Sequence, residues 1–186
     1  MHKDFILGVG CQKGGTTWLR SQLHRHETCD FGFQKEYHVF DRLYDLPKFS
    51  TKFNKNSLKI KYKDLNLPNK NDPSSYQREH FLLDPQNYYD YFESLFLNNK
   101  ILSTTGDVTP AYAGLPIEAF KKLKEKLEEK QFKVKVIFLM RDPIERIWSH
   151  ARMTIERYKV KGKKIPSDYQ SLLDSADENN LELPAV

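Results

Sequence analysis

Short apolar runs alternate with amphipathic stretches along most of the chain, and this alternation predicts the fold class. Apolar runs at 5–9, 101–105 and 134–140 predict three buried strands. Apolar side chains at helical spacing predict helices that span 16–26, begin at 84–85, span 116–130 and begin at 142–143. Because strands alternate with helices, we expect a three-layer α/β/α fold in which helices flank a parallel sheet.

Two stretches interrupt this regular pattern. Residues 31–40 carry apolar side chains at alternate positions, with Glu36 and His38 on the opposite face, which predicts an extended segment at the mouth of the sheet. Residues 41–83 are rich in Lys, Asn, Ser and Pro, and we interpret them as a polar insertion within one domain that spans residues 1–186. Inside the insertion, apolar and lysine side chains alternate in a way that predicts a short strand around Leu58, Ile60 and Tyr62.

Composition narrows the function classes without selecting one. The chain has 186 residues, 39% of them hydrophobic and 30% charged, which fits one domain with a buried core rather than a disordered chain. Its formal net charge of +5 suits an anionic ligand, but solubility alone accounts for it equally well. The charge is modest and the sequence has no nucleic-acid-binding motif, so we expect no nucleic-acid partner.

The sequence gives no indication of a membrane, secretion or metal-binding role. No apolar run approaches the roughly 20 residues of a membrane helix, and the N-terminus lacks the layout of a signal peptide. We therefore expect a cytoplasmic protein without a membrane partner. The two cysteines, Cys11 and Cys29, form no CxxC pair, and with the scattered histidines they predict neither a disulfide framework nor a metal site.

The strongest chemical signal is the glycine-rich segment between the first predicted strand and helix, residues 10–17 with the sequence GCQKGGTT. Gly14 and Gly15 allow a tight turn, and N–H groups at a helix start bind anionic oxygens. The spacing matches the GxxxxGK[ST] loop, but Thr16 occupies the position of its lysine. The only lysine of the loop is Lys13, so we expect a P-loop-like sheet, whereas a P-loop kinase is disfavoured. A glycine-rich turn without a ligand is the alternative.

Four segments together resemble motifs of the sulfotransferases that use 3′-phosphoadenosine 5′-phosphosulfate (PAPS). QKGGTTWL at 12–19 resembles their 5′-phosphosulfate loop. KEYHVF at 35–40 resembles the KExHxF segment of the glycan-modifying branch, and GDVTPAY at 106–112 resembles GExTPxY. MRDPIERIWS at 140–149 resembles the 3′-phosphate motif RDPxxRxxS. The four motifs occur in the order of the family, so the resemblance is specific.

The resemblance implies PAPS-dependent sulfuryl transfer to a hydroxyl or amine acceptor, with no metal required. Lys13 would contact the bridging oxygen and the 5′-phosphate of PAPS, and the loop would hold that phosphate through Gly14, Gly15, Thr16 and Thr17. Arg141 and Ser149 would bind the 3′-phosphate, while Trp18 lies either near the adenine or in the core. The structural alternatives are a solvated lysine in the loop and, for the arginine, a salt bridge to Asp142 or Glu145.

Glu36 is the candidate general base by the same resemblance, because the acceptor hydroxyl must lose a proton during transfer. His38 is the second candidate, since other sulfotransferases use a histidine. The structural alternatives are an exposed Glu36 paired with a lysine and a hydrogen-bonded His38 that only supports the local fold.

The sequence also departs from the family pattern. Val108 stands where some glycan sulfotransferases carry a substrate-binding lysine, so a heparan-like acceptor does not follow from the motifs. The lysines of 41–83 come directly after the candidate base and favour an acidic acceptor, such as an acidic glycan, unless they only keep the protein soluble. No Gly/Arg/Lys-rich loop of the kind that closes over the nucleotide follows the last motif, so we expect a shortened member of the family. The alternative is that the protein binds PAPS but turns it over weakly. No pattern in the sequence indicates the oligomeric state.

Overall fold

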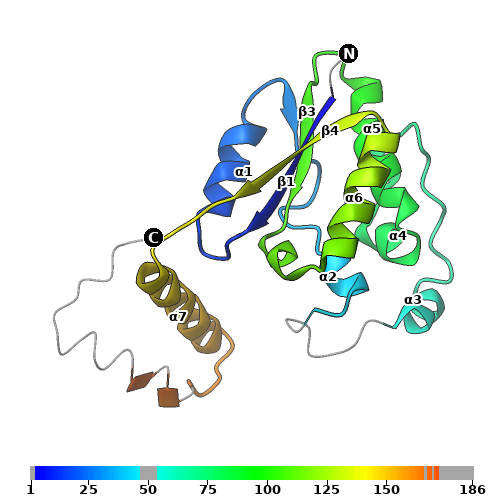
Figure 1. The fold of residues 1–186 in the computed structure, drawn as a ribbon. Helices are drawn as coiled ribbons and strands as arrows, with labels where there is room; N and C mark the ends of the chain where they lie inside the picture. Colours follow the sequence, from blue (N-terminus) through cyan, green and yellow to red (C-terminus); the bar gives the residue numbers. More distant parts are fainter. Residues whose placement is uncertain (1–2, 47–53, 166, 169, 172–186) are drawn as a thin grey trace. The chain divides into compact units, whose positions relative to one another are not determined.

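A sheet of four parallel strands forms the centre of the protein, in the order β2-β3-β1-β4 (Figure 1). The computed structural model describes residues 3–46, 54–165, 167–168 and 170–171. The strands are β1 (Lys3–Gly10), β2 (Cys29–Asp30), β3 (Thr104–Val108) and β4 (Phe132–Phe138). In the register of the sheet, Phe5 of β1 lies between Thr105 of β3 and Val134 of β4.

Helices cover both faces of this sheet and confirm the predicted α/β/α architecture. Helix α1 (Thr16–His24) lies on one side, while α5 (Gln86–Asn98) and α6 (Ile117–Glu129) lie on the other (Figure 1). The apolar stripes that predicted α5 and α6 supply buried side chains, among them Tyr88, Tyr91, Phe92, Leu123 and Leu127, whereas the only buried residue of α1 is Thr16. Strand β3 begins three residues later than the run 101–105 predicts. Asn99 forms a turn there, since its side chain accepts a hydrogen bond from Ile101 N and its carbonyl accepts one from Leu102 N.

The stretch 41–83 contains short helices rather than a strand. They are α2 (Phe40–Leu43), α3 (Lys55–Lys61), the 3₁₀ turn η1 (Pro73–Ser75) and α4 (Arg78–Leu83). The predicted strand around Leu58, Ile60 and Tyr62 is therefore wrong. The Asn54 side chain accepts hydrogen bonds from Asn56 N and Ser57 N and starts a helix at this position, which outweighs the alternating pattern. Residues 47–53 of the stretch lie outside the described residues.

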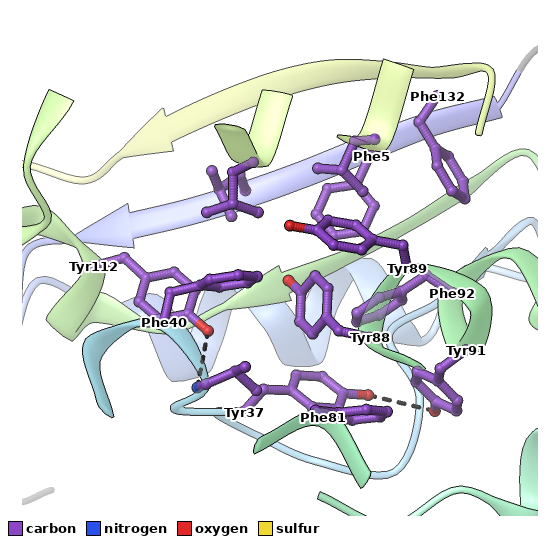
Figure 2. Close-up of a cluster of buried hydrophobic side chains, with 14 of the residues drawn as sticks. Phe5, Tyr37, Phe40, Phe81, Tyr88, Tyr89, Tyr91, Phe92, Tyr112 and Phe132 are labelled. Carbon is purple, nitrogen blue, oxygen red and sulfur yellow. Dashed lines mark hydrogen bonds between the residues drawn. The ribbon is translucent and has the colours of Figure 1, made fainter. Parts of the chain in front are cut away.

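Aromatic side chains dominate the core between the sheet and helices α4, α5 and α6 (Figure 2). Tyr88 of α5 packs edge-on against Phe92 and against Phe40, with ring centroids 4.9 Å apart in each pair. Such pairs contribute about 0.5–1.5 kcal/mol each beyond the area that they bury. Tyr76 and Phe81 join this cluster, so the last part of the stretch 41–83 belongs to the core and is not a polar insertion.

The chain divides into two compact units, Met1–Met140 and Arg141–Val186. The second unit contains helix α7 (Pro143–Val160), which begins where the sequence predicts a helix start. The Asp142 side chain accepts hydrogen bonds from Ile144 N at 2.9 Å and from Glu145 N at 3.1 Å, as an N-cap does. The prediction of one domain over residues 1–186 stays a prediction. Among the described residues, no helix is long and apolar enough to cross a membrane.

Candidate active site

The segments with candidate chemistry leave the sheet at one edge. The strands are parallel, so the loop after β1, the segment after β2 and the 3₁₀ turn η2 (Pro110–Gly114) after β3 all start at carboxyl ends. The neighbouring strands β1 and β3 continue into helices on opposite faces of the sheet, α1 and α6 (Figure 1). Ligands bind in the crevice at such a switch point in open α/β sheets. The candidate site therefore lies at the carboxyl edge between β1 and β3.

The loop between β1 and α1 has a backbone shape that requires its two glycines. Gly15, the N-cap of α1, has φ 96°, a left-handed conformation that glycine adopts without strain. A Cβ on Gly14 would lie 2.8 Å from Cys11 Sγ and 3.1 Å from Leu139 O, so no larger residue fits there. Hydrogen bonds from Cys11 N to Leu139 O and from Leu139 N to Gly10 O fix the loop against the chain after β4.

The start of helix α1 suits an anion. Within the part of the chain that the structure describes, no side chain caps this helix start and its first turn carries no acidic residue. The first N–H groups of the helix lack intrahelical partners, and the helix dipole adds partial positive charge there. Lys13, with φ 64°, lies in the same loop, where the resemblance expects it. The residues present therefore fit a phosphate group.

The side chains at the start of α1 differ in exposure. Thr16 is buried, whereas Thr17 is exposed. Trp18 is 67% exposed, so the alternative that placed its ring in the core is wrong.

Glu36, His38 and Asp41 form a hydrogen-bonded chain in the segment after β2. His38 Nε2 lies 2.9 Å from Glu36 Oε2, and His38 Nδ1 lies 2.6 Å from Asp41 Oδ2. The Asp41 side chain is fully buried, while those of His38 and Glu36 are 18% and 29% exposed. Exposure thus increases along the chain from Asp41 to Glu36, and the glutamate is the member that reaches furthest toward solvent.

The backbone between Glu36 and Asp41 explains how three side chains so close in sequence meet. His38 has φ 53°, in the left-handed region that non-glycine residues seldom adopt. Helix α2 then begins at Phe40 and returns Asp41 toward the imidazole. The predicted extended segment is therefore interrupted at His38. Phe31, Tyr37 and Val39 are buried as the alternating pattern indicates, whereas Phe33 of the same face is 46% exposed. Sequence reasoning missed Asp41, whose signal was an acidic residue three positions after a candidate histidine.

The two residues predicted to bind a 3′-phosphate belong to the second unit. Arg141 Nη2 donates a hydrogen bond to Glu145 Oε2 at 2.7 Å, which is one of the salt bridges considered as the structural alternative. Ser149 lies in α7, two turns beyond Pro143, and is partly exposed. The structure thus places Glu36 next to His38. The residues of the glycine-rich loop form a second group.

No metal centre is visible among the residues that the structure describes. No group of three or more His, Cys, Asp or Glu side chains has an arrangement that would hold a metal ion there. Both cysteines are free thiols, and the sulfur of Cys11 lies against the space beside Gly14. Cys11 therefore has a packing role in the loop.

The parallel sheet and its glycine-rich strand–loop–helix turn place the protein among the three-layer α/β/α proteins with a P-loop-like fold. Residues 5–178 match the family model described as Sulfotransferase family. The chain therefore belongs to the sulfotransferase family, and sulfuryl transfer in general is the activity that this family indicates. No curated protein and no solved structure matches the chain. Membership of the family is thus confirmed, while the glycan-modifying branch stays a prediction.

Proposed function

We propose that this protein transfers a sulfuryl group from PAPS to a hydroxyl or amine of an acceptor, with Glu36 as the general base. The observation that carries the proposal is the chain from Glu36 through His38 to Asp41, at the sheet edge where the glycine-rich loop also lies. Family membership supports the reaction class, and the motif resemblance supports the donor.

The arrangement of the chain favours Glu36 over His38 as the base. Both ring nitrogens of His38 face carboxylate oxygens, at 2.9 Å and 2.6 Å, so neither is turned toward an acceptor. A neutral imidazole has one N–H, whereas a protonated one donates to both carboxylates. In this account His38 is a positioning residue that orients Glu36, and Asp41 orients His38.

PAPS supplies a sulfuryl group attached to its 5′-phosphate: the acceptor oxygen or nitrogen forms a bond to sulfur, and the bridging bond breaks with its electron pair leaving on the phosphate. Glu36 takes the proton that the acceptor loses. Lys13 and the amides at the start of α1 stabilise the negative charge that grows on the departing phosphate. Gly14 and Gly15 let the loop turn before α1, Gly14 by leaving room for Cys11 and Leu139 and Gly15 by its positive φ.

The second phosphate of the donor is assigned to Arg141 and Ser149 on the strength of the RDPxxRxxS resemblance. Arg141 carries a guanidinium that suits bidentate binding of phosphate. Its bond to Glu145 is at a half-exposed surface, where such pairs contribute little and exchange readily. A 3′-phosphate would therefore compete well for Arg141.

An acidic acceptor is the second part of the proposal. Burial, and then the positive charge of Arg42, lowers the pKa of the Arg78 guanidinium, while the charge of Asp41 raises it. The charges of Arg42 and of Asp41, the carboxylate that ends the Glu36–His38–Asp41 chain, thus both act on Arg78. The Nε and Nη2 atoms of Arg78 are buried and have no hydrogen-bond partner among the residues that the structure describes. An anionic group on the acceptor would supply one. The exposed lysines of helix α3 and its C-terminal flank, Lys55, Lys59, Lys61 and Lys63, add positive charge in the same stretch.

The experiment that tests this function follows transfer of labelled sulfuryl from PAPS to a panel of neutral and acidic glycans and small alcohols. We expect transfer, with kcat/KM for acidic acceptors falling more steeply with salt than for neutral ones, because screening shortens long-range attraction. The triple variant Lys59→Gln, Lys61→Gln, Lys63→Gln should flatten that slope. A control with the same charge loss on α6, at Lys121, Lys122 and Lys124, should keep it. Donor binding without transfer to any acceptor would favour the weak-turnover alternative.

A further inference from the structure

Asp107 is a fully buried carboxylate near the end of β3, and the proposed chemistry does not use it. Three hydroxyl groups donate hydrogen bonds to it. Tyr88 and Tyr112 donate to Oδ2 at 3.0 Å and 2.9 Å, and Thr109 donates to Oδ1 at 2.6 Å. Burial, followed by the charge of Asp107, raises the pKa of Tyr88, and the same two causes raise that of Tyr112. Both phenols therefore keep their protons and remain donors to the carboxylate.

Two of these hydroxyls continue to the segment that carries the candidate base. Tyr37 N donates a hydrogen bond to Thr109 Oγ1 at 3.0 Å. Val39 N donates one to the Tyr112 hydroxyl at 3.2 Å (Figure 2). These two amides lie immediately before and after His38. The third hydroxyl, that of Tyr88, bonds to Asp107 but to neither of these amides.

The polarity of this network follows from the buried charge. A hydroxyl that donates its hydrogen to Asp107 presents its lone pairs to another donor. The carboxylate therefore sets Thr109 and Tyr112 as acceptors for the amides of Tyr37 and Val39. Both amides are buried, so their N–H groups would otherwise lack partners.

His38, between these two amides, has a left-handed backbone that is unfavourable for a non-glycine residue. Such a conformation persists only when the surrounding structure holds it on both sides. The two amide bonds provide that hold, one on each flank. The orientation of the His38 ring toward Glu36 depends on this backbone, because the backbone sets the direction of the Cα–Cβ bond and the side-chain rotamers that are allowed.

We propose that Asp107 is a positioning residue: through Thr109 and Tyr112 it fixes the backbone around His38 and thereby aligns Glu36. The catalytic consequence rests on the proposed function, whereas the structural one does not. The role is indirect, because the contacts of Asp107 with this segment run through two hydroxyl groups. Loss of either link should misalign Glu36 without affecting the glycine-rich loop.

The test compares variants of the full chain that remove one hydroxyl each. Tyr112→Phe removes a bond to Asp107 and the link to Val39, whereas the matched control Tyr88→Phe removes only a bond to Asp107. Thr109→Val removes the link to Tyr37, and Thr109→Ser restores a hydroxyl. The readouts are kcat and KM for sulfuryl transfer, binding of adenosine 3′,5′-bisphosphate, and the ¹⁵N resonances of the His38 ring and of the amides of Tyr37 and Val39.

For Tyr112→Phe and Thr109→Val we expect kcat to fall about 10- to 100-fold at nearly unchanged KM and nucleotide binding, with shifted His38 and amide resonances. Tyr88→Phe and Thr109→Ser should stay near the parent in all readouts. Equal effects of Tyr88→Phe and Tyr112→Phe, or unshifted His38 resonances in both link variants, would overturn the proposal. The resonances need no turnover, so they decide the positioning role even if the protein transfers no sulfuryl group.

Discussion

The imidazole of His38 lies 2.9 Å from the carboxylate of Glu36, so the side chains of the two candidate bases are within hydrogen-bond distance of each other. Its other nitrogen lies 2.6 Å from buried Asp41. Because the two side chains are in contact, the orientation of each depends on the other. In the proposed mechanism Glu36, the more exposed of the two, accepts the proton of the acceptor, and His38 orients Glu36.

Replacing Glu36 by Gln should lower turnover by about 10²- to 10⁴-fold, the usual range for loss of a general base. Binding of adenosine 3′,5′-bisphosphate should be nearly unchanged, because the glycine-rich loop that we propose to hold the donor is not altered. Steady-state kinetics and calorimetry measure the two effects. Glu118→Gln, an exposed change on α6, is the control. If Glu36→Gln keeps the full rate while His38→Ala abolishes it, the base is His38.

Replacing Asp41 by Asn should lower kcat by up to about 10²-fold, through misplacement of His38 and Glu36 rather than loss of the base. The amide keeps the size of the side chain but removes the charge beside His38 Nδ1. Asp64→Asn on the exposed surface should have no effect. A parent-like rate and pH profile for Asp41→Asn would show that the third member of the chain has no part in orientation.

The two loop glycines should differ in their response to alanine. Gly15→Ala places a side chain in open space at φ 96° and should cost about 1–2 kcal/mol of stability. Gly162→Ala, at φ 59° and also in open space, is the control, because it carries the same backbone cost away from the loop.

Gly14→Ala should weaken nucleotide binding most, since its Cβ would meet Cys11 and Leu139. Adding Cys11→Ala should rescue only partly, because two backbone oxygens also lie within 3.1 Å of that Cβ. Full rescue would contradict the packing account.

Asp107 and Asp90 should give opposite pH dependence of stability. Burial raises the pKa of Asp107 to about 6, despite hydrogen bonds that lower it. The folded state then binds more protons than the unfolded state between about pH 4 and 6. Stability relative to Asp107→Asn should therefore fall as pH rises through that window, by roughly 3 kcal/mol at most.

The pKa of Asp90 shifts the other way. Burial alone would raise it, but hydrogen bonds from Lys130, Gln86 and Lys70 outweigh burial and lower it. Asp90 thus contributes stability above the ordinary aspartate pKa, and that contribution is lost as pH falls below about 4. Urea unfolding of the parent, Asp107→Asn and Asp90→Asn at several pH values measures both slopes. Slopes of the same sign would contradict the assignment.

The fold and the glycine-rich loop follow from local sequence signals. The period of apolar positions predicted the helices that flank the sheet. Gly14 and Gly15 occupy a turn that favours glycine, Gly14 because a Cβ there meets close neighbours and Gly15 because of its positive φ. The Glu36–His38–Asp41 chain did not follow from such signals. It depends on a left-handed residue and on hydrogen bonds that the amides flanking His38 donate to Thr109 and Tyr112, more than 70 positions away. The lysine-rich helix α3 was missed for a local reason: Asn54 caps it, and its apolar residues also alternate.

The central claim is that the protein binds a donor with a 3′-phosphate, and calorimetry with adenosine 3′,5′-bisphosphate, PAPS and ATP tests it most directly. We predict that the first two bind at least about tenfold more tightly than ATP, a difference of about 1.4 kcal/mol. Arg141→Ala should remove this preference, while Arg157→Ala, an exposed control on α7, should retain it. Lys13→Ala should weaken binding of PAPS. Binding of ATP as tight as that of PAPS, or tighter, would contradict the account.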